Sequence, residues 1–430
     1  MSAAWLLSQR HKVTVYEQDG RLGGHTNTVE VDLDGVRHPV DTGFIVYNEQ
    51  NYPNLTALFR HLGVETRASD MSFGVSLDDG RLEYGSVGWR GLFAQYRNAV
   101  NPRFWSMMRD LVRFYREAPA YVGASDSISL GGYLERHGYG RAFRDDHLLP
   151  MAAAIWSAPA HALLDYPAEA FIRFCENHGL LELASRPQWR TVIGGSRSYV
   201  ERLTRIYGER VRLQCGIKGI ARTAAGVLVT DATGRTEMFD HVVIATHADQ
   251  ALAMLDDATG RERDLLSVFR YERNVAVLHT DLAFMPRRRG AWSSWNYLGR
   301  RDDAAGEKLC VTYWMNNLQG IVSERPLLVT LNPATAPRSE TVLHSEVYQH
   351  PIFDNATSAA QKLLWSLQGS NRTWFCGAYF GAGFHEDGLQ AGLAVAESLG
   401  GVRRPWTVAN ESGRIVVDET LRAPSFVQAA

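Results

Sequence analysis

An acidic residue and a pair of glycines, spaced as in a dinucleotide site, carry the clearest chemical signal of this chain. The β-branched run Val13–Tyr16 ends in Glu17, and a turn with Arg21, Gly23 and Gly24 follows. An acid at the tip of a strand accepts hydrogen bonds from ribose hydroxyls. Glycines let the backbone approach a pyrophosphate closely. The pattern therefore predicts the later part of a nucleotide-binding βαβ unit.

The opening part of such a unit is not found in the sequence. A βαβ unit begins with a strand and a G-x-G-x-x-G turn, whereas this chain begins at Met1, and the segment Ser2–Ser8 already reads as a helix. We therefore expect a start site placed about fifteen residues late, or a truncated chain. Without the glycine-rich turn, several backbone amides that would face a pyrophosphate are missing from the sequence as it stands.

A second glycine-rich segment lies far along the chain, from Phe375 to Ala396. It reads as a strand, then a loop that begins at Gly377, then a helix rich in small residues over Asp387–Leu399. The amides and the dipole at a helix start stabilise negative charge. The segment therefore predicts a second wall of an anion-binding or cofactor site.

The motif Glu17-x-x-x-Arg21-x-Gly23-Gly24-His25, taken with this second segment, resembles the superfamily of flavin-containing amine oxidases and phytoene desaturases. The chain is more closely similar to a branch of FAD-dependent oxidoreductases that is often encoded beside cyclopropane fatty acid synthases. The resemblance covers about residues 1–400. It implies an α/β fold of the two-dinucleotide-binding-domain flavoprotein type, with a Rossmann-like FAD domain and an α+β substrate domain.

The resemblance also implies which residues hold FAD. They are Glu17, Arg21, Gly23, Gly24, His25, Gly43, Phe44, Ile217, Thr246, Gly377, Asp387, Gly388 and Leu389. Gly377 would lie against the diphosphate, and residues 387–389 would lie under the flavin ring, where the helix start stabilises charge at the N1/O2 edge. Two readings stay open for His25, which contacts the cofactor or only caps the turn. Likewise, His247 lines the groove, or it caps a helix or is solvated.

Composition narrows the class of protein. A chain of 430 residues with 45% hydrophobic content can bury a large core. The net charge of −2 gives no reason to expect a nucleic-acid partner. The four cysteines are scattered and read as reduced thiols, and no residue pattern predicts a metal site. No apolar run is long enough to span a membrane. We expect a cytoplasmic protein, with peripheral contact at the inner membrane face and the oligomeric state left open.

Periodicity and turn residues predict the elements that position these residues. We expect hairpins over Thr28–Val40 and Ser72–Tyr84, a helix near Tyr52–Leu62, a meander over Gly216–Arg222, Gly226–Thr230 and Glu237–Phe239, a strand at His241–Thr246, and antiparallel strands at Val275–His279, Trp295–Leu298, Leu309–Trp314 and Leu327–Leu331. Residues 88–183 are mostly helical in pattern.

This order of elements predicts an interleaved pair of domains. Residues 1–64, 188–256 and 370–400 would form the FAD-binding domain, and 65–187 with 257–369 the substrate domain. The remaining residues, 401–430, read as a tail of uncertain order.

The catalytic side chain is not predicted. Many amine oxidases place a lysine beside the flavin on a strand of the second half, and the best-matching strand here, Arg273–Leu278, has none. A flavin desaturase needs no such residue, because geometry and the flavin carry the hydride step. An aromatic-rich second half suits an apolar tunnel. We therefore expect oxidation of an apolar substrate, a fatty acyl or related lipid chain.

Two alternatives stay open at this stage. The first is an amine or polyene oxidase of the same fold. A lysine or an acidic pocket near the flavin ring would favour this alternative. The second is a non-catalytic accessory protein that binds lipid or a partner enzyme and has lost FAD. The missing glycine-rich turn is the reason to keep the second alternative.

Overall fold

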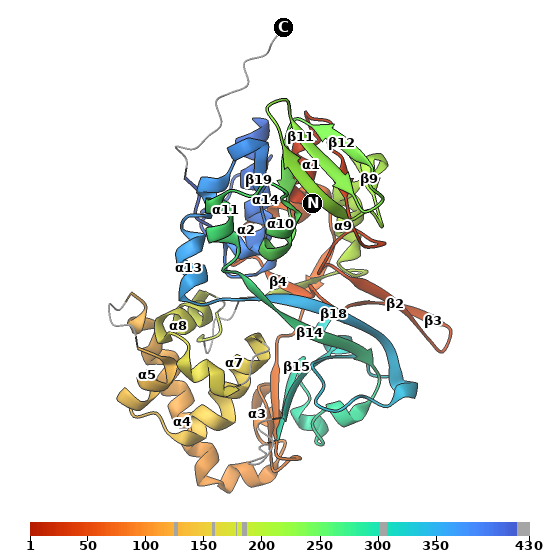
Figure 1. Cartoon of the computed structure of the whole chain (residues 1–430). Helices are drawn as coiled ribbons and strands as arrows, with labels where there is room; N and C mark the ends of the chain where they lie inside the picture. The colour runs from red at the N-terminus through yellow and green to blue at the C-terminus, as the bar shows by residue number, and fades with distance from the viewer. Residues whose placement is uncertain (124–127, 157–159, 178, 183–186, 301–307, 419–430) are drawn as a thin grey trace.

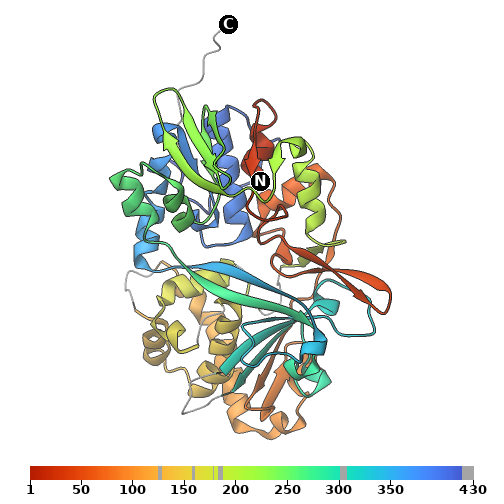
Figure 2. The same ribbon diagram turned by 45° about the vertical axis from the view of Figure 1, so that its right-hand side comes forward.

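The computed structural model describes residues 1–123, 128–156, 160–177, 179–182, 187–300 and 308–418. Figures 1 and 2 show two lobes joined by long strands. One lobe holds the N-terminus together with the green and blue segments of the later chain, and the other holds the orange and yellow helices. The α/β fold predicted from the sequence is confirmed.

The first lobe is built on two pairs of short parallel strands. The pairs are β1 (Val15–Tyr16) with β9 (Val211–Arg212), and β13 (Val242–Ile244) with β19 (Thr373–Phe375). Helix α1 (Ser2–Leu7) packs along α14 (His385–Gly400). A side chain on Gly392 would overlap the Ser2 hydroxyl, so the two helices can approach this closely only with glycine there. Within the described residues, no strand joins the two pairs.

Smaller elements cover these strands. The antiparallel meander of β10 (Ile217–Arg222), β11 (Val227–Asp231) and β12 (Thr236–Phe239) lies within a residue of its predicted bounds. The lobe also contains α2 (Pro53–Leu62), α9 (Arg197–Thr204), α10 (Ala248–Met254), α11 (Gly260–Leu266) and α13 (Asn355–Gln361), with the small sheet β4 (Val46–Asn48), β8 (Trp189–Val192) and β5 (Thr66–Ala68) beneath. Helix α2 ends where Gly63 takes a left-handed conformation, as predicted.

The second lobe contains a seven-stranded mixed sheet. Its order is β18 (Val342–Ile352), β14 (Arg270–His279), β17 (Leu328–Leu331), β16 (Lys308–Trp314), β15 (Trp295–Arg300), β6 (Phe73–Leu77) and β7 (Leu82–Gly85). Strands β14 and β18 run side by side along the boundary between the lobes (Figure 1). The predicted strands are confirmed, but β18 was not predicted. Neither of its faces is fully buried, so it lacks the clear apolar alternation that marks a strand.

Helices pack on one side of this sheet. They are α3 (Gly88–Leu92), η1 (Tyr96–Val100), α4 (Pro102–Glu117), α5 (Leu130–Arg136), α6 (Arg141–Phe143), α7 (Leu149–Trp156) and α8 (Ala168–Asn177). The hairpin of β2 (Thr28–Leu33) and β3 (Val36–Asp41) turns at Asp34-Gly35, as predicted. No helix among the described residues is both long and apolar enough to cross a membrane.

Two separate clusters of buried apolar side chains hold the lobes. One combines Leu6, Phe59, Ile244, Phe375 and Leu393, and the other Phe104, Phe143, Phe171, Leu278 and Tyr297. The division into an FAD-binding and a substrate domain stays a prediction. Its bounds differ from the clusters, because Leu266 and Ala360, predicted in the substrate domain, lie in the first cluster.

Residues 401–418, predicted as a tail of uncertain order, pack against the first lobe. Arg404 is buried and pairs with Glu397, and it also donates to Asn54 in α2 at 2.8 Å. Ile415 joins the first apolar cluster. In the sequence, a charged residue such as Arg404 cannot be told apart from a residue exposed to solvent, because a partner such as Asn54 lies far along the chain. The packing of this segment could therefore not be predicted. Residues 419–430 lie outside the described part of the chain.

Candidate functional site

One large cavity, of about 2910 Å³, runs from the paired parallel strands of the first lobe into the second lobe. All but one of the residues predicted to hold FAD line it: Glu17, Arg21, Gly23, Gly24, His25, Gly43, Phe44, Ile217, Thr246, Gly377, Gly388 and Leu389. They come from segments that are far apart in the sequence. Asp387 alone is absent from the walls. The structure thus joins the two distant motifs in one space.

Glu17 marks one end of the cavity. It directly follows β1 and is partly buried, and one carboxylate oxygen accepts a hydrogen bond from the Asp19 amide at 3.0 Å. The other oxygen has no hydrogen-bond partner among the described residues. A strand-end carboxylate with an open acceptor, on a wall shared with Ile217 of β10, is the arrangement that a ribose diol requires.

The turn after Glu17 is shaped by glycine. Gly23 has φ +121°, and a Cβ there would lie 2.5 Å from the carbonyl oxygen of Thr26. The Arg21 guanidinium donates to the carbonyl of Gly24 at 2.8 Å and to that of Thr26 at 3.4 Å. Arg21 therefore braces the turn from one side, while the glycine backbone is left bare toward the cavity.

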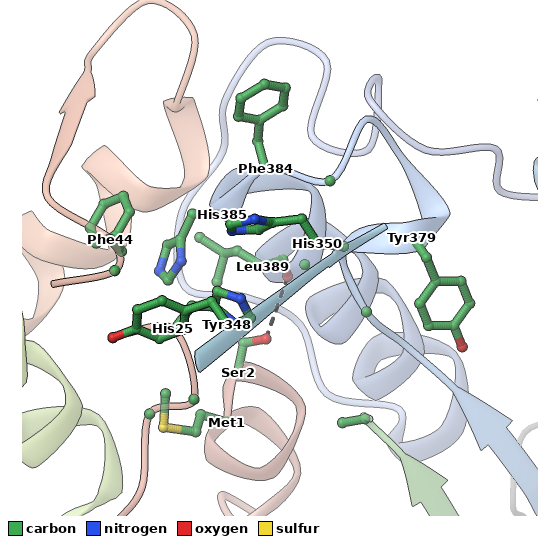
Figure 3. Close-up of a pocket in the computed structure, with 18 of the residues that line it drawn as sticks. Met1, Ser2, His25, Phe44, Tyr348, His350, Tyr379, Phe384, His385 and Leu389 are labelled. Carbon is green, nitrogen blue, oxygen red and sulfur yellow. Dashed lines mark hydrogen bonds between the residues drawn. The ribbon is translucent and has the colours of Figure 1, made fainter. Parts of the chain in front are cut away.

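An aromatic group forms the middle of the cavity (Figure 3). The rings of Phe44 and His385 stack with centroids 4.0 Å apart. The Tyr199 hydroxyl bonds to His385 Nε2 at 2.6 Å and to Thr26 Oγ1 at 2.6 Å, which fixes the imidazole in place. Phe44 is held in turn by its amide, which donates to the carbonyl of His25 at 2.8 Å. These contacts give the cavity a preformed wall.

Gly43 is the tightest point of this wall. A side chain at Gly43 would overlap the carbonyl oxygen of His25. We expect Gly43→Ala to lower the free energy of unfolding by about 1–3 kcal/mol and to weaken FAD binding, because Phe44 must shift. Urea unfolding and FAD titration would measure both effects. Gly208→Ala is the control, since a Cβ there meets no atom within 4 Å; equal losses in the two variants would contradict this account.

Histidines gather beside the aromatic wall. The ring of His25 lies 5.0 Å from that of Tyr348 and 5.4 Å from that of His350, both on β18 (Figure 3). His247 stacks on Tyr271 at 4.1 Å. The Nε2 atom of His25 and the Nδ1 atom of His247 are buried without a hydrogen-bond partner in the described structure. Buried polar atoms without partners inside a cavity point to a polar ligand.

This placement bears on the two open readings. The His25 ring lies in the cavity wall, as contact with a cofactor would require. His247 does both things considered, because it is the N-cap residue of α10 and lines the cavity. Sequence reasoning missed Tyr348, His350 and His385. Tyr348 and His350 occupy alternate positions of the unpredicted strand, and His385 lies two residues before the predicted helix start.

These histidines are held neutral. Burial, with the neighbouring histidines His350 and His247, lowers the pKa of His25 to about 3. Burial lowers the pKa of His385 to about 4 and also lowers those of His247 and His350. A neutral imidazole offers one N–H donor and one acceptor. The wall therefore presents hydrogen-bonding groups without fixed positive charge.

The low pKa values predict acid sensitivity. As pH falls from about 7.5 to 5.5, His25 and His385 take up protons in the unfolded chain but not in the folded one. For each of the two histidines, this difference lowers the free energy of unfolding by about 1 kcal/mol. Burial raises the pKa of Asp41 to about 6, so the folded chain takes up a proton there over the same pH range. This uptake stabilises the folded state by about 1 kcal/mol and offsets the effect of one of the histidines. Urea unfolding at both pH values should show a smaller pH dependence in His25→Gln than in the parent chain. An equal dependence would rule out this role for His25.

The structure corrects the role of Asp387. Its side chain turns away from the cavity, accepts a hydrogen bond from the Phe384 amide at 2.8 Å, and forms a close ion pair with Arg414. The amides of Asp387 and Gly388 both donate to the Phe384 carbonyl. Those of His385 and Glu386 have no acceptor among the described residues. The free donors at this helix start thus lie about two residues earlier than predicted.

The part of the cavity inside the second lobe is mostly apolar. Its walls include Met71, Phe73, Leu92, Met108, Leu111, Met151, Leu180, Trp295 and Tyr313. Neither β14 nor β18 carries a lysine, so the strands nearest the histidines offer no primary amine. No group of three or more His, Cys, Asp or Glu among the described residues could hold a metal ion.

The fold and the cavity together define a protein with a dinucleotide-type binding site. Comparisons with known proteins give its family. The chain belongs to the family of flavin-containing amine oxidoreductases, whose model matches residues 1–350. It is an FAD-dependent oxidoreductase. The family therefore favours the enzyme over the non-catalytic accessory protein. No curated protein matches the chain.

Solved structures share the fold at low sequence identity. Cyclohexylamine oxidase from Brevibacterium oxydans matches with a TM-score of 0.64 and 16% identity, covering 93% of this chain and 96% of that one. Wild-type putrescine oxidase bound to putrescine matches with 0.62 and 15%, covering 93% and 96%. A fatty acid isomerase from P. acnes that produces CLA matches with 0.57 and 14%, covering 91% and 94%.

The residues present fit FAD. The bare glycine turn, the strand-end acid and the unpartnered imidazole nitrogens line one continuous cavity. When bound, FAD supplies the two-electron acceptor for a hydride from the substrate. Glu17 would take the ribose hydroxyls, and Gly23 and Gly24 would let backbone reach the pyrophosphate. The amides of His385 and Glu386 would donate toward developing negative charge. Phe44 and Tyr348 would limit water around the reacting centre.

Proposed function

We propose that this enzyme oxidises an apolar substrate, a fatty acyl or related lipid chain, by removing a hydride and a proton. The observation that carries the proposal is the apolar inner cavity, whose methionines and aromatic rings continue directly from the histidine wall. Flexible methionine and flat aromatic side chains suit an extended hydrocarbon. The proposed residues for FAD are the cavity-lining set given above, with Asp387 acting on the fold instead.

The active-site side chains would orient the substrate more than they exchange protons with it. His25 and His350 would lie between the apolar part of the cavity and the proposed flavin site, and burial holds both neutral. A neutral imidazole there offers one hydrogen-bond donor and one acceptor, with which it can orient the substrate.

An amine oxidase remains the second candidate, favoured by the fold shared with cyclohexylamine oxidase and putrescine oxidase. A cationic amine would need an anionic or aromatic partner near the ring. Asp70 lines the inner cavity and accepts hydrogen bonds from Ser72, Ser294 and Asn317, all at one carboxylate oxygen, Oδ1. The mostly apolar walls around it are the reason to prefer the lipid.

The test is anaerobic bleaching of the flavin absorption by candidate substrates. We expect bleaching by long-chain acyl lipids and none by mono- or diamines. Met71→Trp should shift the preference toward shorter chains, because it fills part of the apolar cavity, whereas Val322→Trp, at a position 92% exposed, should not. Bleaching by amines alone would overturn the proposal in favour of the second candidate.

A further inference from the structure

An exposed aromatic surface covers the end of the second lobe. It comprises residues 86–109, which include α3, η1 and the first half of α4, and is called here the α3–α4 face. Its large apolar side chains are unusually open to solvent: Trp89 is 73% exposed, Tyr96 89%, Val100 81% and Trp105 48%. Exposed aromatic clusters of this kind mark an interaction site. Figure 1 shows α3 and α4 in the lobe opposite the N-terminus.

Charge on this face has one sign. No acidic residue lies between Glu83 and Asp110, whereas arginines stand at 90, 97, 103 and 109. Arg103 is paired with the buried Asp146. Arg90 and Arg97 are exposed and have no ion-pair partner within the described part of the chain. Two uncompensated positive charges therefore lie among the exposed rings.

A second basic segment extends the same face. The short helix η7 (Arg289–Ala291) packs on α3, since a Cβ on Gly290 would lie 3.1 Å from the Cβ of Ala94. Arg287 and Arg289 of this segment are exposed. The Arg289 guanidinium lies 5.1 Å from the centre of the Trp292 ring. Positive charge thus borders the aromatic patch on a neighbouring element as well.

A hollow in this face reaches toward the inner cavity. It measures about 570 Å³ and is lined by Trp89, Phe93 and Trp105 among others. Leu92 and Met108 line both this hollow and the large cavity, so their side chains are the wall between the two. Trp89 stacks parallel to Phe93, with ring centroids 5.9 Å apart. The rings form an ordered apolar surface with arginines beside it.

We propose that the α3–α4 face docks the enzyme on an anionic lipid bilayer. Tryptophan and tyrosine prefer the interface between lipid and water, and arginine holds its guanidinium at anionic headgroups while its stem lies among apolar groups. A nucleic acid or an acidic protein would be attracted by the arginines but would leave Val100 and the apolar hollow uncovered. The bilayer satisfies both parts of the face. Delivery of an acyl chain past Leu92 and Met108 rests on the proposed function, whereas docking does not.

Vesicle sedimentation tests the proposal. The FAD-loaded full chain should bind vesicles of phosphatidylcholine with phosphatidylglycerol, and bind vesicles of phosphatidylcholine alone weakly. Each exposed arginine near the surface contributes about fivefold to affinity, so Arg90→Gln/Arg97→Gln should lose about 25-fold. Trp89→Ser/Trp105→Ser should lose binding by a comparable factor. The parent's binding should also fall as salt is raised.

A control variant with two substitutions in the first lobe tests whether vesicle binding depends on the α3–α4 face or on any exposed cation and apolar side chain. Lys362→Glu/Leu363→Ser changes an exposed cation and an exposed leucine in the first lobe, and should bind vesicles as the parent does. All substituted positions are exposed or partly so, and flavin content would verify folding. Absence of binding to anionic vesicles, or equal loss in the control variant, would overturn the proposal. Binding to nucleic acid but not to vesicles would overturn it as well. None of these outcomes depends on which substrate is oxidised.

Discussion

Replacing Arg414 by methionine is expected to lower the free energy of unfolding by about 3–5 kcal/mol, because a buried carboxylate loses its partner. Asp387 is fully buried, and its ion pair with Arg414 offsets the cost of burying the charge. The backbone amide of Arg414 also donates a hydrogen bond to the Gln390 side-chain oxygen at 3.1 Å. Urea unfolding of the parent and the variant would measure the loss.

Two controls make this result specific. Arg403→Met removes the ion pairs of a mostly exposed arginine with Glu397 and Glu411 in the same region, and should cost at most about 1 kcal/mol. Arg414→Met/Asp387→Asn should recover part of the loss, since no unpaired charge is left buried. An Arg414→Met loss no larger than that of Arg403→Met would show that the pair does not hold residues 401–418 on the helix start.

Replacing Glu17 by alanine is expected to weaken FAD binding about 100-fold. Hydrogen bonds to a charged group contribute about 1.5–3 kcal/mol each, and the ribose diol can make two to this carboxylate. Unfolding of the cofactor-free chain should change little, because the Glu17 carboxylate accepts only one hydrogen bond within the described structure, from the neighbouring Asp19 amide. Titration of the cofactor-free chain with FAD, followed by flavin fluorescence, would give the affinity.

Glu324→Ala is the matched control for this experiment. Glu324 is exposed and lies away from the cavity walls, so its removal should leave FAD affinity unchanged. Equal affinity of Glu17→Ala and the parent would mean that the sugar binds elsewhere. The proposed orientation of the cofactor would then be wrong, although membership of the flavin-dependent family would stand.

The features that the sequence predicted correctly are mostly those that depend on residues close together in the chain. The acid after β1 and the glycine turn lie within a few residues of each other, so their chemistry is visible without a fold. The same holds for the β2–β3 turn at Asp34-Gly35 and for the meander. These features depend on neighbouring residues, and the structure places them as predicted.

Features that depend on contacts between distant segments were missed. Phe44 and His385 stack across most of the chain length, and β18 brings Tyr348 and His350 to His25. No spacing within one segment indicates such a meeting. Asp387 shows the opposite error, since an acid at a helix start suits either a cofactor wall or a helix cap. Only its burial beside Arg414 decides between the two.

The most direct test of the account is a crystal structure of the chain with FAD bound. We predict that the adenosine ribose hydroxyls lie within hydrogen-bond distance of the Glu17 carboxylate. The flavin ring should lie between Phe44 and the start of α14, within reach of the His385 and Glu386 amides. A cofactor bound with its ribose away from Glu17, or with its ring outside this cavity, would contradict the account.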